Sequence, residues 1–219
     1  MDKQVEKDRI IFHADCDGFF ASVEETYHPE YREIPMAVAG NPENRHGIIL
    51  AKNTLAKKAG IKTAETIWKA KQKCPDLFLC PPRHQEYSDF CNRINEIYEN
   101  YTDQVERFSI DESFLDVTGS LHLFGGNPLE LAHRIRREVQ EKIDLTISIG
   151  VSYNKIFAKV GSDYCKPNNA VLITRNNYKQ IIWPLPVSDL FMAGRKTCEE
   201  LKNTVLIPSA HSPASTKIS

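Results

Sequence analysis

Seven apolar residues spaced three and four positions apart limit the possible folds more than any other feature of the sequence. They predict one helix over residues 83–101 with a continuous apolar stripe. The residues of this stripe are Tyr87, Phe90, Cys91, Ile94, Ile97, Tyr98 and Tyr101. Such a stripe is typical of a helix that forms one face of a hydrophobic core.

The patterns around this helix are those of an α+β layer. We expect strands at 10–15, 104–110, 113–117, 145–151 and 170–174, and further helices at 127–143 and 154–164. The start of the helix at 127 is marked by a cap residue, a proline and a glutamate. This order favours a ferredoxin-like fold, a mixed and mostly antiparallel sheet with helices on one face.

Residues 16–84 interrupt this layer with a small α/β lobe of short elements. We expect helices at 19–27, 53–59 and 63–74, and strands at 47–50 and 77–79. Asp17 is the candidate cap of the first of these helices, and Thr63 is the candidate cap of the third. Gly60 is the candidate end of the second helix.

The charge balance excludes a globally basic nucleic-acid binder. Lys plus Arg is 28 and Asp plus Glu is 29, so the formal charge is 28 − 29 = −1. The N-terminus has no apolar signal segment, and the sequence contains no run of about 18 apolar residues, so we expect no membrane span. Six scattered cysteines without a CxxC pair predict reduced thiols and a cytoplasmic location.

Two acidic sites are candidates for chemistry. Asp15 and Asp17 flank Cys16 at the end of the first strand, and Asp111 and Glu112 lie between two apolar strands. Close carboxylates repel one another, and Mg²⁺ removes that cost because it prefers oxygen ligands. The spacing is equally consistent with a structural role, in which Asp15 and Asp17 cap a helix and Asp111-Glu112 forms a solvated turn.

Three segments resemble the motifs of the Y-family translesion DNA polymerases, with the bacterial DNA polymerase IV and UmuC-like branch as the most similar. They are residues 13–24 (HADCDGFFASVE), 108–116 (FSIDESFLD) and 148–159 (SIGVSYNKIFAK), the last followed by Cys165-Lys166-Pro167. The resemblance covers roughly residues 9–190. It implies a palm at 1–18 and 85–175, fingers at 19–84, the start of a thumb at 176–203 and an irregular tail at 204–219.

The resemblance also implies a two-metal site for nucleotidyl transfer. The carboxylates of Asp15, Asp111 and Glu112 and the carbonyl of Cys16 would bind two Mg²⁺ ions, for which Mn²⁺ can substitute. Glu112 is the residue that the family treats as essential for catalysis. The implied partners are primer–template DNA and a deoxynucleoside triphosphate, in DNA repair and damage tolerance.

By the same resemblance, a second group of residues would bind the nucleotide. The amides of Gly18, Phe19 and Phe20 would meet the phosphates, with Phe20 as the ring that excludes a ribose 2′-hydroxyl and Phe19 in the core. Thr54 and Lys57 match positions where the family usually has Tyr and Arg, so a bidentate phosphate contact is lost. Lys166 matches the family's phosphate-contacting lysine without change.

The resemblance ends after Asn203. Between Val187 and Lys202 we expect one or two short helices, and no little-finger domain or clamp-binding tail follows, although the full-length family can bind a sliding clamp. We therefore expect a truncated chain, natural or engineered, that binds DNA weakly and in a salt-sensitive way. Two alternatives are a non-catalytic nucleic-acid or protein-binding module that keeps the palm, and an unrelated metal-dependent enzyme such as a nucleotidyl cyclase.

Overall fold

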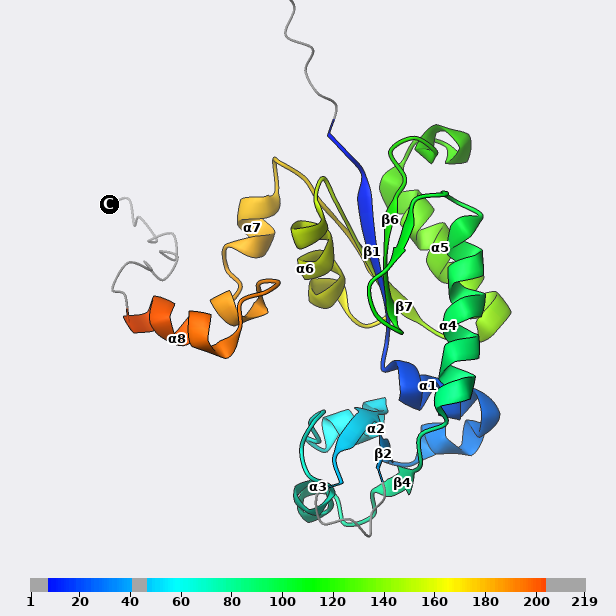
Figure 1. Ribbon diagram of the computed structural model, residues 1–219, viewed down its shortest axis with the longest axis vertical. Helices are drawn as coiled ribbons and strands as arrows, with labels where there is room; N and C mark the ends of the chain where they lie inside the picture. Colours follow the sequence, from blue (N-terminus) through cyan, green and yellow to red (C-terminus); the bar gives the residue numbers. More distant parts are fainter. Residues whose placement is uncertain (1–7, 41–46, 204–219) are drawn as a thin grey trace, which may run out of the picture.

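A five-stranded sheet and a smaller three-stranded sheet organise the chain (Figure 1). The computed structural model describes residues 8–40 and 47–203. The strand order in the large sheet is β5-β6-β1-β7-β8. The bounds are β1 Ile11–Cys16, β5 Val105–Arg107, β6 Glu112–Asp116, β7 Ile147–Ser152 and β8 Ala170–Ile173. The sheet is mixed and mostly antiparallel as predicted, since only β7 and β8 pair in parallel.

Alternation along the central strand β1 separates a core face from a second face. Phe12, Ala14 and Cys16 belong to the main core, together with residues of the helices α4 (His84–Glu99) and α5 (Pro128–Ile143). The predicted apolar stripe is buried along its whole length. The Asn127 side chain caps α5 by accepting hydrogen bonds from the amides of Leu129 and Glu130.

The other face of the sheet carries helix α6, Lys155–Cys165, so the prediction of helices on one face was incomplete. Ala158 of α6 clusters with Ile11 and Phe114 on this side. A glycine in β7 makes the close packing possible, because a Cβ at Gly150 would lie 1.9 Å from the carbonyl oxygen of Ala158. Helix α6 is therefore held close against β7 and β1.

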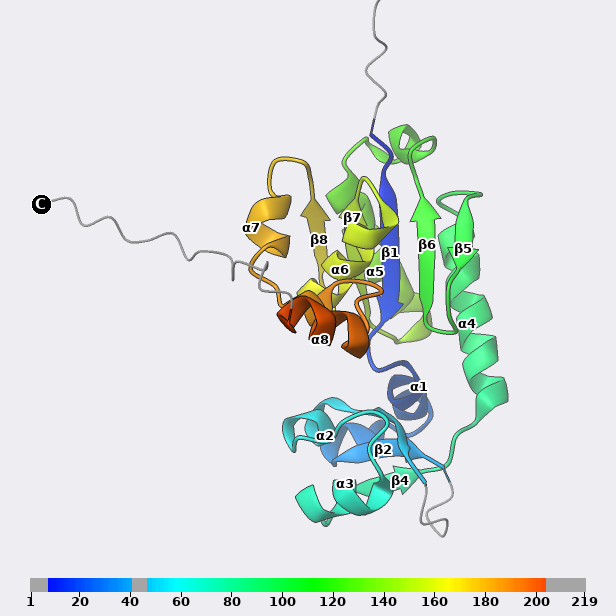
Figure 2. The ribbon, with the colours of Figure 1, turned by 60° about the vertical axis from the view of Figure 1, so that its left-hand side comes forward.

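The small lobe has its own sheet, in the order β3-β2-β4, and its own core. Its elements are β2 Met36–Ala39, β3 Ile49–Lys52, α2 Thr54–Lys58, α3 Ile67–Lys73 and β4 Phe78–Cys80. Helix α1, Phe19–Tyr27, contacts β3 and connects the two lobes (Figure 2). Strand β2 was not predicted. The cap of α3 is Thr66, and the prediction of Thr63 was wrong.

The last described segment consists of short helices. These are α7 Tyr178–Ile182, which was not predicted, the 3-10 turn Val187–Asp189, and α8 Arg195–Asn203. A further 3-10 turn covers Pro29–Glu33 and another covers Leu121–Phe124. The expected irregular tail at 204–219 lies outside the described residues. Over 8–40 and 47–203, every helix is too short or too polar to cross a membrane.

Candidate active site

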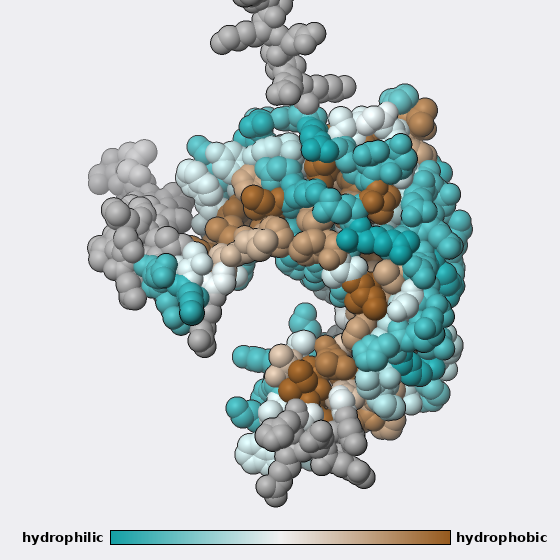
Figure 3. Space-filling view, in the orientation of Figure 1, coloured by the Kyte–Doolittle hydropathy of each residue, from teal (hydrophilic) through white to brown (hydrophobic). Residues whose placement is uncertain are grey.

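The two predicted acidic segments meet at one end of the large sheet. Asp15 and Glu112 are register partners in the antiparallel ladder of β1 and β6, so their side chains lie on the same face. The amide of Cys16 donates a 3.0 Å hydrogen bond to the carbonyl of Asp111. This end of β1 points toward α1 and the small lobe, and the surface is hollowed between the lobes (Figures 2 and 3).

Two lysines from the α6 side neutralise this acidic end. Nζ of Lys166 lies 2.7 Å from Oδ2 of Asp15, and Nζ of Lys159 lies 2.9 Å from Oε1 of Glu112. Asp163 contacts both lysines, at 3.0 Å and 3.9 Å. Among the residues that the structure describes, no three His, Cys, Asp or Glu side chains converge closely enough to hold a metal ion. Asp15 and Glu112 are thus each directed toward a lysine, whereas the Asp111 carboxylate accepts a hydrogen bond from the Ser109 hydroxyl at 2.6 Å.

Burial makes the charge of Asp15 costly. Asp15 is 3% exposed, and burial raises the pKa of its carboxyl to about 7 against the opposing effect of Lys166. Although burial acts in the opposite direction, the charge of Asp15 raises the pKa of Lys166. The ammonium therefore keeps its proton, and the ionised form of Asp15 depends on it. A divalent cation would stabilise the same carboxylate.

At Glu112, neighbouring groups affect the carboxyl pKa more than burial does. Burial raises its pKa, but His13 and Lys159 outweigh burial and lower it to about 2. The fully buried His13 lies with Nε2 3.6 Å from Oε2 of Glu112, too far for a hydrogen bond, while its Nδ1 pairs with the Ser162 hydroxyl at 2.7 Å. Glu112 is thus ionised at neutral pH, and its oxygens can bind a metal ion.

The turn after β1 differs from the prediction. Asp17 does not cap α1, because its carboxylate accepts hydrogen bonds from the Ser148 hydroxyl and the Asn168 amide, both at 2.8 Å. Gly18 precedes the helix with φ +59°, and no side chain caps the helix. The first hydrogen bond of α1 runs from the Ser22 amide to the Gly18 carbonyl. The amides before Ser22 therefore have no partner within the helix and are available to a ligand.

The two predicted phenylalanines occupy different environments. Phe19 is buried in the core, as expected, and Phe20 is partly exposed. The Phe20 ring stacks on the buried ring of Tyr87, with a centroid distance of 4.1 Å and an interplanar angle of 12°. The Tyr87 hydroxyl donates to Glu24, and Arg83 donates to both oxygens of the same carboxylate. Phe20 therefore rests on a fixed surface.

Thr54 and Lys57 lie on α2, across from the start of α1. Both side chains are exposed. Lys52, the last residue of β3, approaches Gly18, since a Cβ there would lie 3.4 Å from the Lys52 carbonyl. Burial lowers the pKa of Lys52, and the charge of nearby Lys57 lowers it further. Lys52 and Lys57 thus place two positive charges close together, and the Lys52 ammonium donates to the Thr63 hydroxyl at 2.9 Å.

Sequence reasoning did not single out Lys159 or His13. Both stand inside the quoted motifs, at the last and first positions respectively. The sequence does offer a clue to both. Lys159 on its helix and His13 on its strand are polar residues at positions where an apolar, packed residue is expected.

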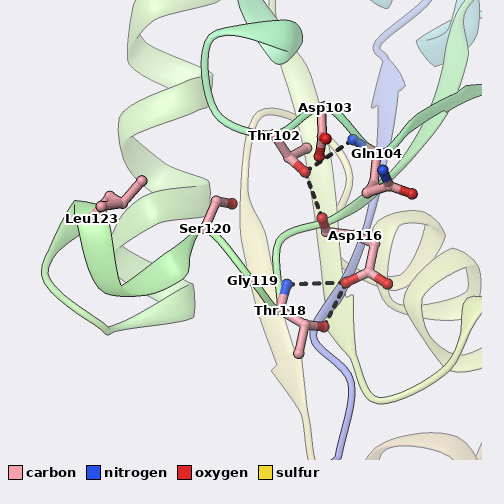
Figure 4. Close-up of a pocket in the computed structure, with 8 residues that line it drawn as sticks. All are labelled: Thr102, Asp103, Gln104, Asp116, Thr118, Gly119, Ser120 and Leu123. Carbon is pink, nitrogen blue, oxygen red and sulfur yellow. Dashed lines mark hydrogen bonds between the residues drawn. The ribbon is translucent and has the colours of Figure 1, made fainter.

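Two shallow cavities lie beside the large sheet, at different distances from this cluster. One, of about 360 Å³, is at the opposite end of β6, where Thr118 and Thr102 hydrogen-bond to Asp116 (Figure 4). The other, of about 400 Å³, separates α6 from the segment 185–192 and is lined by Lys159 and Asp163. Only the second touches the acidic end of the sheet.

Comparison with known proteins gives consistent matches. The model of the impB/mucB/samB family matches residues 14–163. DNA polymerase IV of Acetivibrio thermocellus is 49% identical over 195 residues, which are 89% of this chain and 49% of that protein. DNA polymerase IV 1 of Bacillus subtilis is 40% identical over 196 residues, 90% of this chain and 47% of that protein. The chain thus spans about half the length of these curated relatives.

Solved structures match the same region. DinB from Sulfolobus solfataricus superposes with a TM-score of 0.80 and 33% identity, covering 89% of this chain and 57% of that one. The insertion ternary complex of Dbh DNA polymerase gives a TM-score of 0.81 and 32% identity, covering 90% and 58%. The similarity therefore extends over both lobes described above.

Proposed function

Because this chain belongs to the impB/mucB/samB family of Y-family DNA polymerases, we propose that it is the catalytic core of a translesion DNA polymerase. Residues 1–18 and 85–175 form the palm, 19–84 the fingers and 176–203 the start of the thumb. Its substrates are primer–template DNA and a deoxynucleoside triphosphate. We place the reaction in the cytoplasm, in keeping with six unpaired cysteines.

The acidic end of the sheet suits two Mg²⁺ ions. Asp15, Asp111 and Glu112 supply hard carboxylate oxygens, and the Cys16 carbonyl adds a neutral one. A buried carboxylate with a raised pKa, opposite a second carboxylate, gains from a cation. When bound, the metal would supply charge neutralisation for in-line phosphoryl transfer. Asp15 would first have to exchange its Lys166 partner for the cation.

The nucleotide would lie between α1 and α2. The uncapped amides of α1 suit the triphosphate, and Lys57 and Lys166 add positive charge beside it. The Phe20 ring, supported by Tyr87, would occupy the space that a 2′-hydroxyl requires. The side chains would therefore bind the triphosphate, orient the nucleotide and exclude a ribose 2′-hydroxyl. Phosphoryl transfer depends mainly on such positioning and on charge stabilisation.

The pairing of Asp15 with Glu112, next to Asp111, carries the proposal. Primer extension at low salt with Mg²⁺ or Mn²⁺ tests it, comparing the parent chain with Asp111→Ala. Asp103→Ala is the control, because this exposed carboxylate lines the cavity at the other end of β6. Extension that is lost only in Asp111→Ala supports catalysis. DNA retention without extension in all three proteins would favour the non-catalytic binding module.

A further inference from the structure

Lys159 touches the acidic end of the sheet, and the proposed function leaves it without a role. Its side chain is 15% exposed, and its ammonium contacts Glu112 at 2.9 Å and Asp163 at 3.9 Å. A cation this deeply placed requires a carboxylate partner. Glu112 is the closer of the two by about an ångström, and it is also far less exposed than Asp163.

The Lys159 ammonium is confined by two aromatic rings. It lies 6.0 Å from the Phe108 ring centroid and 5.9 Å from that of Phe191, within the range of cation–π attraction. The two rings contact each other edge to face at 5.8 Å. Phe108 comes from the loop before β6, and Phe191 from the segment before α8. The backbone of α6 is fixed as well, because it lies against Gly150.

Glu112 needs such a partner to stay where it is. It is the register partner of Asp15 and follows Asp111 in the chain, so like charges lie nearby. Like charges in opposite strand positions repel, and a glutamate at the start of a strand has the freedom to turn toward solvent. Lys159 binds Oε1 and leaves Oε2 on the side of His13.

We propose that Lys159 is a positioning residue that holds the Glu112 carboxylate in place as a metal ligand. The proposal rests on the proposed function, because that function makes Glu112 a ligand. Partners that orient metal ligands typically change metal affinity by about 10- to 100-fold when removed.

Removing Lys159 has two effects of opposite sign. The loss of a positive charge strengthens the attraction of the remaining carboxylates for a divalent cation. The loss of the ammonium that fixes Glu112 weakens binding, because the site loses a ligand. If Lys159 is a positioning residue, the second effect is the larger and its removal weakens metal binding. The direction of the change in metal affinity therefore tests the proposal.

The test is a titration of the full chain with Mn²⁺ alone, with free Mn²⁺ followed by electron paramagnetic resonance. We expect Lys159→Met to bind Mn²⁺ about tenfold more weakly and Lys159→Arg to retain most of the affinity. Lys155→Met is the control, since it removes the same charge from the same helix but its partner is Glu106. We expect this control to bind like the parent chain.

Unchanged or tighter binding by Lys159→Met would overturn the positioning role while leaving the proposed function intact. If the parent chain does not bind Mn²⁺, or Asp15→Asn binds it as tightly as the parent chain, the proposed function fails and this inference fails with it. Lys159→Gln keeps a hydrogen-bond donor and is the second variant should Lys159→Met not fold. We expect its affinity to lie between those of Lys159→Met and the parent chain, and parent-like affinity would again contradict a positioning role for the charge.

Discussion

Nζ of Lys166 contacts Oδ2 of Asp15 at 2.7 Å, which joins the segment after α6 to the end of the central strand. Lys166 also reaches Asp163 at 3.0 Å, so it has a second carboxylate within contact. A divalent cation that binds Asp15 therefore competes with Lys166, and Asp163 is the nearby acceptor for the displaced ammonium.

Metal binding at Asp15 is expected to depend on pH. Burial raises the pKa of this carboxyl from 3.8 to about 7, so below pH 7 a proton occupies the group that the cation needs. We expect Mg²⁺ affinity, measured by calorimetry, to rise about tenfold between pH 6 and pH 8. The sign for folding is opposite, because a raised carboxyl pKa makes folding less favourable as pH rises from about 4 to about 7. A slope that persists in Asp15→Asn would contradict the assignment.

Phe20→Ala is expected to relax sugar selection. The Phe20 ring rests on Tyr87 at 4.1 Å and would fill the space needed by a 2′-hydroxyl. We expect the ratio of ribonucleotide to deoxyribonucleotide incorporation to rise about tenfold or more in primer extension. Phe78→Ala, a ring on β4 outside this site, is the control and should leave the ratio unchanged. Equal ratios in Phe20→Ala and the parent chain would remove Phe20 from this role.

Glu24 is expected to be a major contributor to stability. Its carboxylate is 1% exposed and accepts hydrogen bonds from Arg83 and the buried Tyr87 hydroxyl. Glu24→Ala leaves that hydroxyl unpaired, so we expect the free energy of unfolding to fall by about 3 kcal/mol or more in urea denaturation. Glu30→Ala removes an exposed carboxylate and should cost less than about 1 kcal/mol. Similar losses in both variants would show that the buried pair is not special.

Gly150→Ala is expected to disrupt the packing of α6 on the sheet. The added Cβ would lie 1.9 Å from the Ala158 carbonyl and 2.4 Å from the Ser162 amide, so the helix would have to move. We expect a loss of about 3 kcal/mol in the free energy of unfolding. Gly119→Ala, where nothing lies within 4 Å of the new carbon, should be nearly neutral. Parent-like stability of Gly150→Ala would mean that α6 is free to shift.

Elements with a clear period were predictable from the sequence. The apolar stripe of α4 is buried as expected, and α1 spans 19–27 as predicted. Strand β2 was missed because Met36–Ala39 is a run of four buried residues, in which no alternation distinguishes a strand from a helix. Helix α7 was missed because its five residues are too few to show a period and no side chain caps its start, whereas the equally short α2 has a capping Asn53.

The site was predictable only in part. The meeting of Asp15 with Asp111 and Glu112 follows from strand order, which the sequence patterns indicate. The lysine partners depend on how closely α6 approaches the sheet, which depends on backbone contact at Gly150. Asp17 fits the pattern of a helix cap, yet a hydroxyl from β7 and an amide beyond α6 bind it instead. Tertiary contacts of this kind leave no periodic trace.

The two hydrogen bonds that hold Asp17 also determine how a ligand meets α1. They join the turn after β1 to Ser148 and Asn168, so this turn is ordered by folding itself. An anion that binds the helix amides meets groups whose conformational freedom is already lost. Its association therefore carries a small entropic penalty on the protein side, and most of the contact energy remains as affinity.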